Sequence, residues 1–284
     1  MTILVTGATG QLGRLVIDSL ISRGAEPQRI VAGARDTVKA RDLAERGVTV
    51  VTLDYSEPVT IAAALQGVDT VLLISGSEVG RRAAQHQAVI DAAAAAGVSK
   101  FVYTSAPNAT TSELVLAPEH KATEEAITAA GLPAVILRNN WYTENYVADL
   151  TRAAETGVIA ASVGDGRVAS ASRADYADAA AAVLLNDGHI GEIYELGGDV
   201  AWDYRQLADA MAVVIGRPVT YQALSPEEYE VALGAAGMDA GTVGFVTALD
   251  AGIRGGALAD SNGTLARLIG RPTTPLVQGL RALV

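Results

Sequence analysis

The sequence of 284 residues contains no cysteine, which excludes several kinds of chemistry at once. Without thiols the chain forms no disulfide, holds no iron–sulfur cluster or cysteine-bound zinc, and has no thiolate nucleophile. Histidine is also scarce, because His86, His120 and His189 are the only three and are widely spaced. We therefore predict no metal site.

Positive charge and long hydrophobic runs are lacking as well. The chain has 21 Lys and Arg against 32 Asp and Glu, a net charge of −11, whereas nucleic-acid binding needs a basic surface. Apolar residues come in runs of about 4–8, far short of the roughly 20 that span a bilayer. No signal peptide is recognisable at the N-terminus. We predict a soluble, cytoplasmic protein with no nucleic-acid partner and no membrane span.

Over the first 140 residues, short aliphatic runs alternate with helical stretches. The runs are continuous, as is typical of strands covered on both faces. We predict strands at 2–5, 30–34, 49–53, 70–74, 101–104 and 134–137. Glycines suited to helix C-caps stand between them, at Gly24, Gly47, Gly67, Gly97 and Gly131. This alternation predicts an α/β fold, a Rossmann doubly wound parallel sheet.

The alternation of strands and helices becomes less regular after Arg138. We predict helices at 142–155, 174–185 and 204–215, an extended piece at 167–172, strands at 193–196 and 219–222, and three short final helices. Ser225 is the expected N-cap of one of these. No linker separates the halves, so we expect a Rossmann core at 1–140. Residues 141–284 are expected to form mainly a small dependent C-terminal lobe, with some segments returning to the core.

A glycine-rich loop follows the first strand and opens the first helix. Its glycines, Gly7, Gly10 and Gly13, have distinct expected roles: a tight turn, close approach of a pyrophosphate, and close packing of the helix. The free amides at the helix N-terminus then face the phosphates. We predict that the loop residues bind a dinucleotide, namely Thr6, Gly7, Ala8, Thr9, Gly10, Gln11 and Leu12.

The end of the second strand indicates which dinucleotide is bound. NAD-binding proteins place a carboxylate there, whereas this chain has Gly33 and Ala34 followed by Arg35. A guanidinium at this position can bind the 2′-phosphate of NADPH. The alternative is a solvated loop in which Arg35 pairs with Asp36. We favour NADPH, which makes residues 1–140 an NADP-binding core.

The scarcity of lysine bears on catalysis. Ordinary short-chain dehydrogenases use a serine with Tyr-x-x-x-Lys, in which the lysine lowers the pKa of the tyrosine. The residues four positions before Lys39, Lys100 and Lys121 are Arg35, Ala96 and Ala117, so no such pair exists. Either the substrate needs little acid catalysis, as a quinone does, or the chain binds the cofactor without turnover.

Aromatic and amide residues are concentrated after the sixth predicted strand, where open α/β sheets bind ligands. We predict that Asn139 bonds the nicotinamide carboxamide, and that a planar substrate is bound by Asn140, Trp141, Tyr142 and Tyr146. Tyr142 and Asn140 are the candidates for catalysis, and the proton donor is unidentified. The alternative is that the aromatic residues anchor the lobe. His120 and Lys121, at the start of a helix, could reach the pocket, but we favour a solvated first turn for both.

Several segments resemble one family. They are 1–13, 137–146, 164–177, 194–202 and 268–274. The chain resembles the NmrA-like, atypical short-chain dehydrogenase/reductases, and within them the bacterial NAD(P)H:quinone oxidoreductases, with triphenylmethane reductases as relatives. The resemblance implies NADPH at the glycine loop and Arg35, no flavin, and direct hydride transfer to quinones.

The resemblance also implies roles for single residues. It places Asp54 near the adenine amino group, Ser75 and Gly76 along the ribose, and Ser105 at the usual serine position of the cofactor site. Arg173 and Asp175 match a family motif, and whether they contact ligand is left open.

Two other functions fit the same motifs. One is an NmrA-type redox sensor that binds NADP without turnover, and the other is a reductase of other planar electrophiles such as triphenylmethane dyes. The aromatic segment 139–146 favours an enzyme, because a sensor needs no side chains that bind a substrate. The physiological substrate and the choice between monomer and homo-oligomer stay open.

Overall fold

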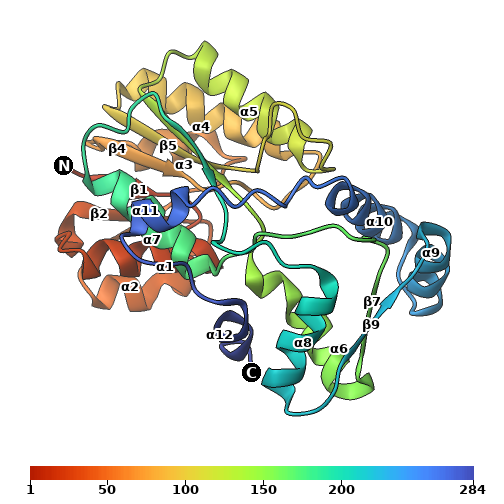
Figure 1. Ribbon diagram of the computed structural model, residues 1–284. Helices are drawn as coiled ribbons and strands as arrows, with labels where there is room; N and C mark the ends of the chain where they lie inside the picture. The colour runs from red at the N-terminus through yellow and green to blue at the C-terminus, as the bar shows by residue number, and fades with distance from the viewer. The chain divides into compact units, whose positions relative to one another are not determined.

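The computed structural model describes residues 1–284, which divide into two compact units (Figure 1). The first unit comprises Met1–Thr110, Pro118–Asn139 and Arg173–Glu195. The second comprises Thr111–Ala117, Asn140–Ser172 and Leu196–Val284. Each unit is therefore assembled from segments that are separated in the sequence.

The first unit is built on a seven-stranded sheet of order β3-β2-β1-β4-β5-β6-β8. Its strands are β1 (Ile3–Val5), β2 (Ile30–Ala34), β3 (Thr49–Thr52), β4 (Thr70–Leu73), β5 (Lys100–Ser105), β6 (Ala134–Asn139) and β8 (Ile193–Leu196). Strand β1 pairs in parallel with both β2 and β4, and β2–β3, β4–β5 and β5–β6 are parallel as well. The predicted doubly wound parallel sheet is confirmed, with strand ends shifted by up to two residues.

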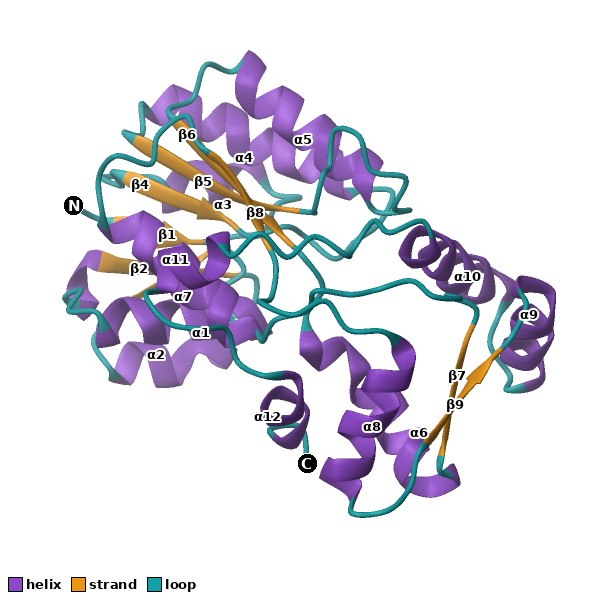
Figure 2. Ribbon diagram, viewed as in Figure 1, coloured by secondary structure: helices purple, strands orange, loops and turns teal.

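Helices cover both faces of this sheet (Figure 2). They are α1 (Gln11–Ser22), α2 (Arg41–Glu45), α3 (Pro58–Ala64), α4 (Arg82–Ala96), α5 (Ala117–Ala129) and α7 (Arg173–Leu185), with 3₁₀ turns at Pro27–Arg29 and Thr37–Ala40. Apolar residues of α3, α4 and α5 form one core with those of the strands, including Ile61, Val89 and Ile127. The continuous apolar runs are explained by this arrangement, because β1, β2, β4 and β5 are buried throughout.

The five glycines predicted as helix caps all adopt positive φ, between +64° and +94°. Gly97 is the C-cap of α4, in the left-handed conformation that costs glycine little. The glycines predicted to end helices therefore all adopt the backbone conformation that this role requires.

The second unit has its own apolar core and a two-stranded parallel sheet. Its elements are a 3₁₀ turn (Thr143–Tyr146), α6 (Val147–Thr156), β7 (Val158–Ala161), α8 (Tyr204–Ile215), β9 (Thr220–Ala223), α9 (Pro226–Ala235), α10 (Ala240–Arg254), α11 (Thr264–Ile269) and α12 (Leu276–Arg281). Trp202, Tyr204 and Met211 are buried in that core. Ser225 caps α9 in a reciprocal bond pattern with Glu228, as predicted.

Several predictions for this half are wrong. The helix predicted at 142–155 is a 3₁₀ turn followed by α6, and the partner strand β7 was not predicted. Four helices close the chain instead of three, and α10 is 15 residues long. Its glycines obscure it in the sequence, yet Gly252 has a packing reason, because a Cβ there would lie 2.9 Å from Cδ2 of Leu114.

Lys100 is a buried cation at the start of β5, with 5% of its surface exposed. Its Nζ donates to the carbonyls of Asn186 at 2.8 Å, Val183 at 3.1 Å and Leu184 at 3.4 Å. These carbonyls lie at the C-terminal end of α7, where a positive charge complements the helix dipole. Lys100 therefore joins α7 to the sheet.

Replacing Lys100 by Met should lower the free energy of unfolding by about 2–3 kcal/mol, because buried carbonyls lose their charged donor. Chemical denaturation followed by circular dichroism measures the change. Lys121→Met is the matched control, since Lys121 is exposed and should change stability by less than about 0.5 kcal/mol. Equal effects of the two substitutions would contradict this role for Lys100.

Candidate functional site

The glycine loop leads from β1 into α1 without any side chain capping the helix. Gly7 adopts φ +58°, and Gly10 is the N-cap of α1. A Cβ on Gly13 would lie 2.4 Å from the carbonyl oxygen of Gly7, so only glycine lets the helix approach the loop. A Cβ on Gly10 would meet only that same oxygen, at 3.1 Å. The loop is thus open toward the uncapped amides of α1, an arrangement that fits a phosphate.

This loop lies at the point where the strand order reverses, between β1 and β4. Open α/β sheets bind ligands at the carboxyl ends of strands at such a point. Thr6 joins the two strands there, because its Oγ1 donates to the carbonyl of Leu72 and accepts from the amide of Ile74, both at 3.0 Å. The hydroxyl of Tyr55 lies 2.5 Å from the same oxygen and donates to the carbonyl of Ile74 at 2.8 Å. The side chain of Thr6 therefore links the carboxyl ends of β1 and β4.

Arg35 follows β2 and is 68% exposed. Its Nη1 lies 3.1 Å from Oε1 of Glu78, in the loop after β4. Asp36 instead accepts a hydrogen bond from the amide of Val38, so the alternative of an Arg35–Asp36 pair is not what the structure shows. The sequence could not identify Glu78 as the partner, since it lies 43 residues away.

Asp54 and Ser75 lie in the two loops that follow β3 and β4. Asp54 is partly exposed and accepts from the amide of Ser56 at 2.8 Å. The amide of Ser75 donates to Oγ1 of Thr104 at 3.0 Å. Both are positioned by the loop backbone, and their contacts with a cofactor stay predictions.

The buried side chain of His86 binds the backbone of Gly76. The amide of Gly76 donates to Nε2 of His86 at 3.0 Å, which assigns the ring proton to Nδ1. That nitrogen lies 2.9 Å from Oγ1 of Thr123, whose hydroxyl donates to the carbonyl of Glu119. Burial, with the nearby charge of Arg82, lowers the pKa of His86 to about 3. A neutral imidazole thus positions a loop that was predicted to contact the cofactor.

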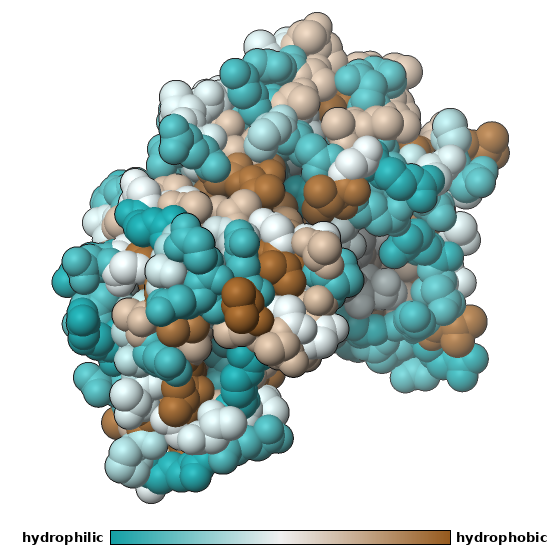
Figure 3. Space-filling view, turned by 90° about the vertical axis from the view of Figure 1, so that its right-hand side faces the viewer, coloured by the Kyte–Doolittle hydropathy of each residue, from teal (hydrophilic) through white to brown (hydrophobic).

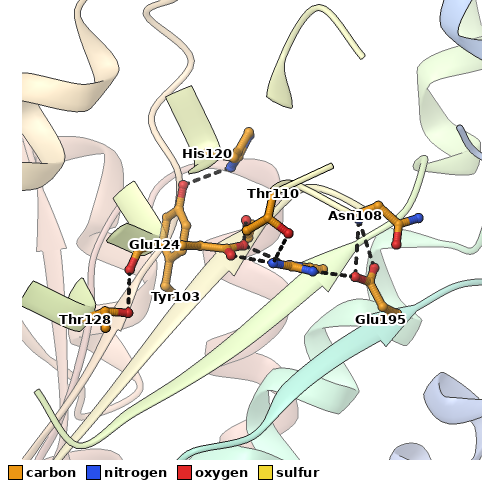
Figure 4. Close-up of polar contacts among 9 residues, drawn as sticks. Tyr103, Asn108, Thr110, His120, Glu124, Thr128 and Glu195 are labelled. Carbon is orange, nitrogen blue, oxygen red and sulfur yellow. Dashed lines mark hydrogen bonds and ion pairs between the residues drawn. The ribbon is translucent and has the colours of Figure 1, made fainter. Parts of the chain in front are cut away.

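A second buried histidine, His120, bonds to Tyr103 (Figure 4). Its Nε2 accepts from Nη1 of Arg82 at 2.9 Å, so its Nδ1 donates to the Tyr103 hydroxyl at 2.8 Å. Burial again lowers the pKa to about 3, with Arg82 as the next cause. The prediction of a solvated turn is wrong for His120 and correct for Lys121. His120, Thr123, Glu124 and Ile127 lie at helical spacing on the buried face of α5, a pattern that could have found them.

Ser105, at the end of β5, donates its hydroxyl to Oε1 of Glu124 at 2.6 Å. Nε and Nη2 of Arg138 also bind the Glu124 carboxylate, at 2.9 and 2.6 Å, and Nη1 binds Glu195 at 2.8 Å. Figure 4 shows Glu195 beside Asn108, whose amide donates to both of its oxygens. The hydrogen bonds that Arg138 donates to these carboxylates, with Glu124 the larger cause, raise the pKa of its guanidinium. The serine hydroxyl is therefore directed to a buried carboxylate.

The predicted substrate residues follow β6. Asn139, the last residue of β6, is buried in the first unit. Within the second unit, Nδ2 of Asn140 donates to the carbonyl of Leu258 at 3.1 Å, and its Oδ1 accepts from the amide of Trp141 at 2.6 Å. Trp141 and Tyr142 are partly exposed. Tyr146 is 3% exposed and packs against Trp202. Its position therefore matches the alternative in which the aromatic residue anchors the lobe.

Three further observations concern metal ions, membrane spans and the surface. No group of three or more His, Asp or Glu residues is arranged to hold a metal ion. None of the helices combines the length and apolar character that crossing a bilayer requires. On the face shown in Figure 3, hydrophobic residues lie in small groups among hydrophilic ones.

The chain is similar to known proteins along nearly its whole length. The family model of the NmrA-like family matches residues 1–242. Quinone oxidoreductase 2 of Escherichia coli K12 is 47% identical over 281 residues, 99% of this chain and 98% of that protein. The crystal structure of the E. coli NADPH-dependent quinone oxidoreductase with NADPH has a TM-score of 0.95 and covers 99% of both chains. Citrobacter sp. triphenylmethane reductase with NADP(H) is 36% identical, with a TM-score of 0.93 and full coverage of both chains.

The buried histidines predict a dependence of stability on pH. Between about pH 6.5 and 3 the unfolded chain takes up protons on His86 and His120 that the folded chain does not. Stability is therefore unaffected by them above pH 6.5 and falls as the pH decreases. His86→Gln should lose about 2 kcal/mol less free energy of unfolding between pH 7 and 5 than the unsubstituted protein. Urea denaturation at both pH values measures this, and the partly exposed His189→Gln is the control. An unchanged pH slope in His86→Gln would refute the assignment.

Proposed function

The chain belongs to the NmrA-like family, and we propose that it is an NADPH-dependent oxidoreductase that transfers hydride directly to quinones, without a flavin. The observation that supports this most is the 47% identity to E. coli quinone oxidoreductase 2 along nearly the whole chain. The proposal extends to a small-molecule quinone as the partner and to the cytoplasm as the place of action.

The first unit carries the residues proposed to hold the cofactor. The open loop at Gly10 and the uncapped amides of α1 fit a pyrophosphate, and the exposed guanidinium of Arg35 fits the 2′-phosphate. The loop backbone at Ser75 and Gly76, held by Thr104 and His86, is proposed to lie along a ribose. Bound NADPH would supply the hydride, and these residues bind and orient it.

The proposed substrate wall consists of Trp141 and Tyr142, which are partly exposed directly after β6. Asn140 bonds the amide of Trp141 and is therefore proposed to position that residue. Positioning suffices for a quinone, because hydride transfer forms an aromatic hydroquinone anion that water can protonate. The absence of Tyr-x-x-x-Lys and the bond of Ser105 to Glu124 agree with a reaction that needs no protein acid.

One alternative substrate class is supported by a specific observation. The 36% identity to triphenylmethane reductase, over the full length of both chains, favours planar dyes as further acceptors. The other alternative, a redox sensor without turnover, would use the same cofactor residues and leave Trp141 and Tyr142 without a ligand.

Mixing the protein with NADPH and a benzoquinone should oxidise NADPH far faster than the uncatalysed reaction. Loss of NADPH absorbance, under steady-state conditions and without added flavin, measures the rate. Trp141→Ala should raise KM for the quinone about tenfold and leave NADPH binding unchanged, since Trp141 is proposed to contact the quinone and not the cofactor. Tight NADPH binding with no acceleration for any quinone would favour the sensor.

Arg35→Ala should weaken NADPH binding by about tenfold or more and change NADH binding little, because only NADPH carries the 2′-phosphate. Titration of nicotinamide fluorescence measures both affinities. Arg46→Ala is the matched control, because Arg46 is an arginine of the same unit in an exposed pair with Asp18. If Arg35→Ala weakened the binding of NADPH and NADH equally, the guanidinium would not recognise the 2′-phosphate.

A further inference from the structure

Glu78 shares its carboxylate between two arginines at the place where a 2′-phosphate would bind. Its Oε1 lies 3.1 Å from Nη1 of Arg35, and its Oε2 lies 3.3 Å from Nη1 of Arg81. Nε2 of Gln85 donates to the same Oε2 at 3.2 Å. The two arginine side chains are 68% and 70% exposed, so the ion pairs lie open to a ligand.

The loop holds this carboxylate in place. The carbonyl of Glu78 accepts from the amides of Arg81 and Arg82, at 3.1 and 3.0 Å, where α4 begins. Farther along the loop, the amide of Gly80 donates to Oε1 of Glu119 at 2.9 Å. The carboxylate is therefore presented to Arg35 by a structured turn.

A carboxylate here acts oppositely on the two dinucleotides. The adenosine ribose of NADH carries a 2′-hydroxyl, which can donate to a carboxylate, whereas the 2′-phosphate of NADPH is an anion that a carboxylate repels. The end of β2 places a guanidinium, Arg35, at this position, and Glu78 approaches it from the loop after β4. A 2′-phosphate that approaches Arg35 therefore meets a carboxylate already bound to Nη1 of the guanidinium.

We propose that Glu78 is a specificity-determining residue that competes with the 2′-phosphate for Arg35 and accepts the ribose hydroxyl of NADH. Glu78 therefore reduces the preference for NADPH over NADH, so that the site can bind both dinucleotides. From the proposed function, this inference takes only the assignment of Arg35 to the 2′-phosphate.

Glu78→Gln removes the charge and keeps the size of the side chain. The substitution should tighten NADPH binding about two- to fivefold, the factor typical of an exposed ion pair, and weaken NADH binding. Direct titration of nicotinamide fluorescence with each dinucleotide, without quinone, measures the ratio of affinities. Glu125→Gln removes an exposed carboxylate elsewhere in the unit and should leave the ratio unchanged.

A double-mutant cycle separates competition from a general effect. In an Arg35→Ala background the NADPH gain of Glu78→Gln should shrink, because there is no Arg35 guanidinium left to compete for and only the repulsion by the carboxylate is relieved. A gain of undiminished size there would overturn the proposal, as would an unchanged ratio in Glu78→Gln alone while Arg35→Ala still weakens NADPH. Failure to reduce quinones would concern the proposed function and leave these titrations intact. Glu78→Asp, which draws the carboxylate back from Arg35, should shift the ratio in the same direction if Glu78→Gln folds poorly.

Discussion

Arg138 is a buried cation, and satisfying its charge organises the first unit around the ends of β5, β6 and β8. An unpaired charge is costly to bury, so the two carboxylates of Glu124 and Glu195 converge on it at 2.6–2.9 Å. Glu124 comes from α5 and also accepts from Ser105, while Glu195 comes from β8 and binds the amide of Asn108. One guanidinium thus ties a helix, three strands and a loop together, and it determines where the Ser105 hydroxyl points.

The two buried histidines of the first unit are neutral and fully hydrogen-bonded. His86 and His120 are buried uncharged, and each accepts one hydrogen bond and donates another. The first supports the peptide of Gly76, and the second connects Arg82 to Tyr103. Such a network fixes loop geometry without placing an acid in the site. This fits a reaction in which the protein orients the reactants and the acceptor itself is easily reduced.

The exposed charges in the loops after β2 and β4 are paired differently from these buried groups. Glu78 lies between Arg35 and Arg81 at exposed pairs, where a ligand can replace the ion pair. Exposed pairs contribute little to stability, so exchanging one for a phosphate contact changes specificity more than it changes the fold. The same unit therefore uses buried charges to set its architecture, and its exposed charges are the ones proposed to select the ligand.

The sequence by itself determined the alternation of strands and helices, the glycine caps, the glycine-rich loop and the lack of Tyr-x-x-x-Lys. Each of these depends on residues close together in the chain, such as Gly7 and Gly13, or on a count of the whole sequence. Only the tertiary structure decided that Arg35 pairs with Glu78, that Ser105 donates to Glu124 and that His120 is buried. It also decided that the glycine-rich stretch at α10 is a helix. The reason is physical: a charged or polar side chain is satisfied by whichever partner the fold brings within about 3 Å, and that partner can lie far away in the sequence.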